Sequence, residues 1–68
     1  MTIELNGEAV EVQPGLTVAE AIVHAGAERN ERGVAVAVDG EVVPRSEWSS
    51  ATLAEGQAVE VVRAVQGG

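Results

Sequence analysis

Two turn dipeptides, Asn6-Gly7 and Asp39-Gly40, constrain the fold of this chain more than any other feature of its sequence. Each lies between short runs rich in β-forming residues, and Asn-Gly or Asp-Gly in such a place favours a type I′ turn, whose two central residues need positive φ. A two-residue loop at Asn6-Gly7 puts Ile3 opposite Val10, so that apolar side chains share one face of the hairpin. The sequence therefore predicts one β-hairpin at the start of the chain and another in its second half.

Between the two hairpins the sequence predicts a single short helix. Pro14-Gly15 ends the preceding strand, and Thr17 followed by Glu20 is a capping-box pattern that begins a helix. Gly26 is suited to the position just after the last helical residue. Apolar residues recur at helical spacing along one face, at Val18, Ala21, Ile22 and Ala25.

The remaining segments complete the predicted architecture. Residues 34–38 form a β-branched strand with Val34, Val36 and Val38 on one side, and a short helical turn is expected around Trp48. Residues 58–65 carry apolar side chains at both alternations, which is typical of a strand in the middle of a sheet. We therefore predict an α+β, β-grasp (ubiquitin-like) fold: a mixed sheet of four to five strands, one main helix on one face, and the last strand parallel to the first. Residues 1–65 would form this domain, and residues 66–68 a flexible C-terminal tail.

The charge balance argues against several classes of partner. The 68 residues include four Arg and no Lys against eleven Asp and Glu, for a formal net charge of −7. A nucleic-acid binder needs a basic face, and anionic membrane surfaces attract basic segments. No apolar run approaches the roughly 18 residues that span a bilayer, and no signal-peptide pattern is visible. We expect a cytoplasmic protein that binds neither nucleic acid nor membrane.

Few side chains in this chain are suited to catalysis. There is no cysteine, and the one histidine, His24, lies well away from the apolar stripe of the predicted helix and has no second histidine with which to bind a metal. The sole aromatic residue, Trp48, is expected to pack at the margin of the core. The glutamates of the strands and turns are expected to be exposed charges; they are Glu4, Glu8, Glu11 and Glu60. We therefore predict no catalytic residue, no bound metal and no bound cofactor.

The terminal pair Gly67-Gly68 is the one feature with a clear chemical use. Glycine lacks a Cβ, so such a tail is slim enough to enter a narrow channel in another protein. The carboxylate of Gly68 is a poor electrophile until a partner activates it, for instance by transferring AMP from ATP. A sulfur nucleophile can then displace AMP and leave a C-terminal thiocarboxylate. The alternative is a frayed end without a role.

The chain resembles the ThiS-type sulfur carriers, ubiquitin-like proteins of thiamine thiazole biosynthesis. The resemblance rests on residues 42–48 (VVPRSEW), on residues 53–56 (LAEG) before the last strand, and on Gly67-Gly68; Gln57 stands where the family usually has Asp. It implies that Gly68 carries first an adenylate and then the thiocarboxylate, with Gly67 and Gln66 threading into the partner.

The resemblance also implies specific partners. An E1-like adenylyltransferase of the ThiF type would activate the tail with ATP and Mg²⁺, a cysteine-derived persulfide would supply sulfur, and a ThiG-type thiazole synthase would accept it. Docking residues are expected on the last strand, among Val61, Arg63 and Val65, although the pattern leaves open which alternation faces outward. The acidic surface predicts basic partner surfaces and association that weakens with salt.

Other functions fit the same sequence. The chain could carry sulfur for molybdopterin or amino-acid synthesis. It could be a ubiquitin-like modifier joined to target lysines. It could also be a β-grasp interaction module whose tail has no role.

Overall fold

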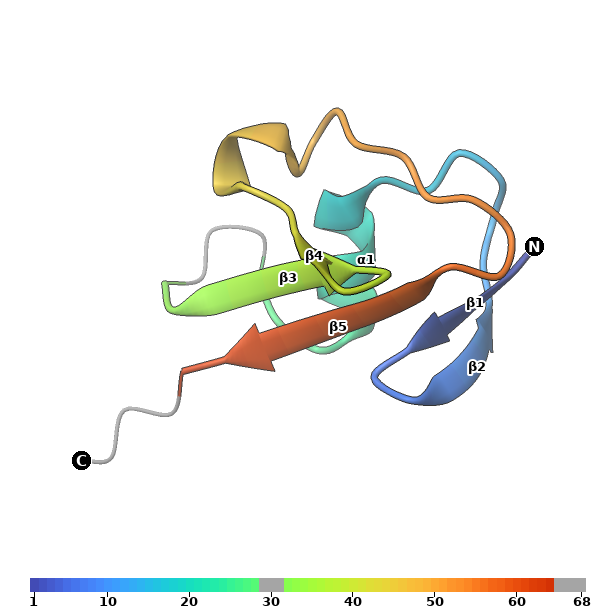
Figure 1. Cartoon of the computed structure of the whole chain (residues 1–68), viewed down its shortest axis with the longest axis horizontal. Coiled ribbons are helices and arrows are strands. Elements are labelled where there is room, and N and C mark those ends of the chain that lie inside the picture. The colour runs from blue at the N-terminus through green and yellow to red at the C-terminus, as the bar shows by residue number, and fades with distance from the viewer. Residues whose placement is uncertain (29–31, 65–68) are drawn as a thin grey trace.

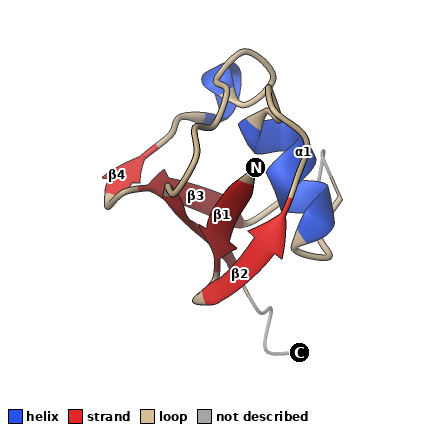
Figure 2. Ribbon diagram, turned by 90° about the vertical axis from the view of Figure 1, so that its right-hand side faces the viewer, coloured by secondary structure: helices blue, strands red, loops and turns tan. Residues whose placement is uncertain are grey.

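The computed structural model of the protein describes residues 1–28 and 32–64, and these form one mixed sheet with a helix packed on one face (Figures 1 and 2). The sheet order is β2-β1-β5-β3-β4. The strands are β1 (Thr2–Leu5), β2 (Glu8–Glu11), β3 (Val34–Val38), β4 (Glu41–Val42) and β5 (Ala58–Arg63), and the helix is α1 (Val18–His24). Strand β5 lies in the middle and runs parallel to β1, which confirms the predicted β-grasp arrangement.

Both predicted hairpin turns are present with the backbone conformation they require. Asn6 and Gly7 have φ of 49° and 84°, and Asp39 and Gly40 have φ of 50° and 84°. Ile3 lies opposite Val10, as the two-residue loop demands. The registers of the two outer strand pairs therefore follow from local turn chemistry.

Helix α1 begins at the predicted capping box. The backbone N–H of Glu20 donates to Thr17 Oγ1 at 3.2 Å, and the backbone N–H of Thr17 donates to Glu20 Oε1 at 2.9 Å. After the helix, Gly26 has φ of 92°, the left-handed conformation that favours glycine there. A helix of seven residues is too short to be stable alone, so its stability comes from burial of its apolar face against the sheet.

The core lies between α1 and the inner face of the sheet. Its largest fully buried side chains come from four elements: Ile3, Val18, Ile22, Val36 and Val59. Burying a side chain of this size contributes about 1.5–3 kcal/mol relative to leaving it exposed. The predicted side of β3 that carries Val34 and Val36 is the inner one, because both residues are buried and Ala35 between them is exposed.

Residues 43–48 follow β4 and pack against the start of helix α1, where the backbone N–H of Ala19 donates to the carbonyl of Trp48. Its 3₁₀ turn, Arg45–Glu47, follows Pro44. The Trp48 side chain is only 5% exposed, its indole N–H donates to the carbonyl of Val43 at 2.9 Å, and the Arg45 guanidinium lies 4.4 Å from its ring centroid. Trp48 is thus a core residue, as predicted. In the parts of the chain that the structure covers, no helix has both the length and the apolar character needed to cross a membrane.

Candidate functional site

Strand β5 is the last strand of the described chain, and its C-terminal end leads toward the C-terminus (Figure 1). The structure describes the chain as far as Ala64. Four of the predicted site residues, Val65, Gln66, Gly67 and Gly68, and with them the predicted boundary between domain and tail, lie outside the described residues. The site can therefore be built up to the point where the chain leaves β5. Contacts with Gly33 and Asn6 hold this end of the strand, and a contact with Asp39 holds its beginning.

A close contact between Gly33 and Ala64 sets the path of the chain at this point. The backbone N–H of Ala64 donates to the carbonyl of Gly33 at 2.7 Å. Gly33 has φ of +75°, and a Cβ at this position would lie 2.9 Å from the Cβ of Ala64. Residue 33 therefore needs glycine for two reasons, because an L side chain is strained at this φ and because no space is left for it.

The turn residues of the two hairpins hold β5 by its backbone. Asn6 Oδ1 accepts the backbone N–H of Val61 at 2.8 Å, which continues the contact with β5 beyond the last residue of β1. Asp39 Oδ1 accepts the backbone N–H of Ala58 at 2.9 Å at the other end of the strand. The sequence pattern marked Asn6 and Asp39 only as turn formers. Their second role depends on β5 arriving between the two hairpins, and the sequence pattern did not indicate it.

The prediction that Val61 belongs to an exposed docking surface is wrong. Val61 is 8% exposed and pairs with Val36 on the inner face of the sheet. Arg63 is exposed, at the end of the strand. The physical reason for the error was visible in the sequence: Glu60 has to face solvent, so the residues on either side of it point into the core.

Val62 has an exposed apolar side chain near the C-terminal end of β5. It is 59% exposed and lies opposite Ala35 of β3, while Val42 of β4 is 76% exposed and lies opposite Ala37. We call these four residues, Ala35, Ala37, Val42 and Val62, the outer patch. The outer patch lies on the face of the sheet that α1 does not cover. Glu60 was again the sequence signal for this exposure, because Val62 lies two residues further along the strand and therefore shares the solvent-facing side of Glu60.

Groups able to bind a metal ion do not gather in this region. Among residues 1–28 and 32–64, no three His, Asp or Glu side chains lie close enough together to hold one. His24 is exposed, as predicted. The predicted surface glutamates are exposed as well; they are Glu4, Glu8, Glu11 and Glu60. What the described residues offer is a firmly held strand end and an apolar surface next to it.

Comparison with known proteins gives consistent matches over the whole chain. The model of the ThiS family matches residues 3–68. The crystal structure of the thiamine biosynthesis protein ThiS from Geobacter metallireducens is 28% identical, has a TM-score of 0.79, and the match covers all of both chains. The solution structure of a thiamine biosynthesis protein from the same organism is 30% identical, has a TM-score of 0.80, and the match covers all of this chain and 88% of the other. The comparison with curated proteins gives no significant match.

Proposed function

The chain belongs to the ThiS family, and on that premise we propose that it is a sulfur carrier protein of thiamine biosynthesis. The observation that carries this proposal is a family match that runs from residue 3 to Gly68 and so includes the glycine tail. Agreement with a ThiS structure over the full length of both chains supports it. The protein then acts as a co-substrate of other enzymes and is not itself a catalyst.

The proposed chemistry takes place at the terminal carboxylate of Gly68. In the first step this carboxylate attacks the α-phosphorus of ATP, pyrophosphate leaves, and an acyl adenylate forms. In the second step the outer sulfur of a cysteine-derived persulfide attacks the acyl carbon, AMP leaves, and an acyl disulfide forms. A thiol of the partner then attacks the inner sulfur of this acyl disulfide, so that the terminus is released as a thiocarboxylate and the partner retains a disulfide. In this proposal a partner carries out both steps, and the carrier, which has no cysteine, supplies only its terminal carboxylate.

The proposed partners are those that the resemblance implies. An E1-like adenylyltransferase of the ThiF type would use ATP and Mg²⁺ to activate the tail, with Gln66 and Gly67 lying in its channel. A ThiG-type thiazole synthase would take the sulfur from the thiocarboxylate. Sulfur carriage for molybdopterin or amino-acid synthesis uses the same tail chemistry and differs only in this acceptor.

The outer patch is suited to transient docking of these partners. It includes the exposed side chain of Val62, two residues before the last described residue, Ala64, so a protein that covers it also lies next to the end of β5. It has only four members, which fits a small interface that must form and dissociate in each cycle. The acidic surface would in addition speed association with basic partner surfaces at low salt.

Intact-mass measurement after reaction with a ThiF-type adenylyltransferase, ATP, Mg²⁺ and a sulfide source tests the proposal directly. We expect the mass to rise by the exchange of one oxygen for sulfur. Deletion of Gly67 and Gly68 should abolish the change, and Gly68→Ala should slow it while leaving the fold intact. An unchanged mass with a partner that modifies its own carrier would contradict the proposal.

The docking surface and the identity of the sulfur acceptor are tested by two further experiments. Val62→Asp, at an exposed position, should weaken association with the adenylyltransferase without loss of folding, while Glu60→Gln on the same face serves as the control. Unchanged association of Val62→Asp would remove the outer patch from the docking surface. Transfer of labelled sulfur to the product of a ThiG-type synthase would distinguish thiazole formation from the other acceptors.

A further inference from the structure

Strand β2 forms one edge of the sheet, and part of its backbone has no hydrogen-bond partner. The backbone N–H of Val12 donates to the carbonyl of Met1 at 2.8 Å, so in this antiparallel pair Val12, Val10 and Glu8 direct their N–H and C=O groups toward β1. The alternate residues, Ala9 and Glu11, direct theirs away from the sheet. Within the described ranges, no hydrogen bond is made by the backbone groups of Ala9 and Glu11.

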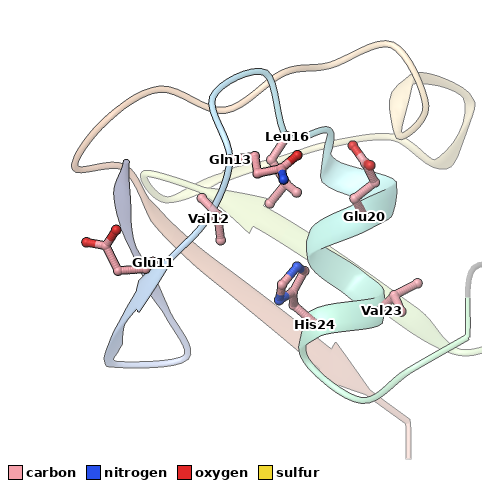
Figure 3. Close-up of a pocket in the computed structure, with 7 residues that line it drawn as sticks. All are labelled: Glu11, Val12, Gln13, Leu16, Glu20, Val23 and His24. Atoms are coloured by element: carbon pink, nitrogen blue, oxygen red, sulfur yellow. The ribbon is translucent and has the colours of Figure 1, made fainter.

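An open groove of about 600 Å³ lies next to this edge, between the end of β2 with its following loop and helix α1 (Figure 3). Three of its lining residues are apolar: Val12, Leu16 and Val23. Val23 is 51% exposed, although it is a large apolar residue on a helix. A strand added at β2 would lie about 4.8 Å from it, with every second side chain above this groove.

We propose that the β2 edge and this groove bind an extended segment of a partner protein in which apolar and basic residues alternate. The apolar side chains would lie over Val12, Leu16 and Val23, while the basic ones would lie on the opposite face of the sheet beside Glu11. The hydroxyl of Thr2 donates to Glu11 Oε1 at 2.7 Å and keeps that carboxylate on the outer face. Backbone pairing supplies affinity in this mode of recognition, and the alternating side chains supply specificity.

Charge complementarity favours such a segment over a second copy of this chain. In a symmetric antiparallel pair of two β2 strands centred on Val10, Glu11 of one copy would lie diagonally opposite Glu11 of the other on the same face, in a protein with a net charge of −7. Like charges across a strand pair are destabilising, and charged side chains on an edge strand oppose pairing of identical edges. A basic strand meets no such repulsion and gains opposite-charge pairs.

The proposed segment would leave the tail accessible. Strand β1 lies between β2 and β5, so a strand added at β2 extends the sheet on the side away from the outer patch. One protein could therefore hold the carrier at β2 while another acts on the end of the chain. The proposal does not depend on sulfur chemistry, and its test does not involve Gly68.

The test uses three short synthetic peptides, each with a fluorescent label. One alternates valine and arginine, one has the same composition with the valines grouped together, and one alternates valine and glutamate. We expect the first to bind the full chain at least about tenfold more tightly than the others, and less tightly as salt is raised. In amide NMR spectra the first peptide should shift the signals of Ala9 and Glu11. Equal binding of the grouped or acidic peptide, no binding at all, or shifts confined to other strands would overturn the proposal.

Two proline variants form a matched pair that tests the proposed backbone hydrogen bonds between β2 and the peptide. Ala9→Pro removes an N–H that points away from the sheet, a place where edge strands tolerate proline. Val42→Pro does the same on the other edge, because the N–H of Val43 donates to Val36 and Val42 therefore points outward. Ala9→Pro should weaken binding of the valine–arginine alternating peptide about tenfold, and Val42→Pro should leave it unchanged. The exposed groove variant Val23→Glu provides a second measurement and should weaken binding of the same peptide about fivefold or more. Binding that is unchanged in Ala9→Pro or in Val23→Glu would overturn the proposal.

Discussion

Substitution of Gly33 tests the contact that sets the path of the chain as it leaves the sheet. In Gly33→Ala the new Cβ is held at φ of +75° and lies 2.9 Å from the Cβ of Ala64. The left-handed conformation costs alanine about 1–2 kcal/mol, of which about 0.4–1 kcal/mol is offset by the lower entropy of the unfolded chain. Crowding against a side chain that cannot rotate away adds about 1–3 kcal/mol. With the middle of each range, the expected loss in the free energy of unfolding is about 2–3 kcal/mol.

Urea unfolding followed by Trp48 fluorescence measures this loss, because the indole is 5% exposed in the folded protein and becomes solvated on unfolding. Gly15→Ala is the matched control: Gly15 has φ of +85°, but nothing lies within 4 Å of a Cβ there. Its expected loss is about 0.5–1 kcal/mol. The difference between the two variants isolates the contact with Ala64. For a domain of this size, a loss of about 3 kcal/mol approaches the whole stability.

A double-mutant cycle completes the test. Ala64→Gly removes the opposing Cβ, so Gly33→Ala combined with Ala64→Gly should lose no more than Gly15→Ala does, once the effect of Ala64→Gly alone is subtracted. The reasoning is refuted if Gly33→Ala is no less stable than Gly15→Ala, or if Ala64→Gly fails to rescue it. Either result would mean that close approach is not what requires glycine at position 33.

Further predictions concern the core, the hydrogen bond between Asn6 and Val61, the helix cap and the dependence of association on salt. Val36→Asp should abolish the cooperative thermal unfolding transition seen by circular dichroism, because Val36 is 1% exposed in the core. Val42→Asp, at an exposed position, should keep the transition. An unchanged melting curve for Val36→Asp would contradict the assignment of Val36 to the inner face of β3. Asn6→Gly should lower the free energy of unfolding by about 0.5–1.5 kcal/mol and speed hydrogen exchange at the N–H of Val61, whereas Asn6→Asp keeps the acceptor. Equal exchange rates in the two variants would argue against a stabilising bond from Val61 to Asn6. Thr17→Ala should lose about 0.5–2 kcal/mol in urea unfolding and Thr17→Ser much less, and equal losses would show that the hydroxyl is not the cap. Association with the adenylyltransferase should slow as salt rises, and a rate that does not change with salt would exclude electrostatic steering.

Most of the architecture followed from interactions between residues close together in the chain. The positive φ of the Asn6-Gly7 turn and the hydrogen bonds between Thr17 and Glu20 depend on neighbours a few residues away, so the sequence predicted both correctly. The alternation within β3 predicted its buried face for the same reason. The resemblance to the ThiS family, which the family match supports, rested on the sequence alone, because the tail and the segment 42–48 are linear motifs.

The arrangement of β5 and of the chain at its C-terminal end was decided by contacts between segments that are distant in the sequence. Which side chains of β5 are buried depends on its pairing with β3 and β1, and this places Val61 in the core and Val62 at the surface. The bond from Val61 to Asn6 spans 55 positions along the chain, and the contact between Gly33 and Ala64 arises only after the sheet has assembled. Local patterns specify turns, caps and periodicity. Long-range pairing in the sheet decides which strand face is buried and which backbone groups are held.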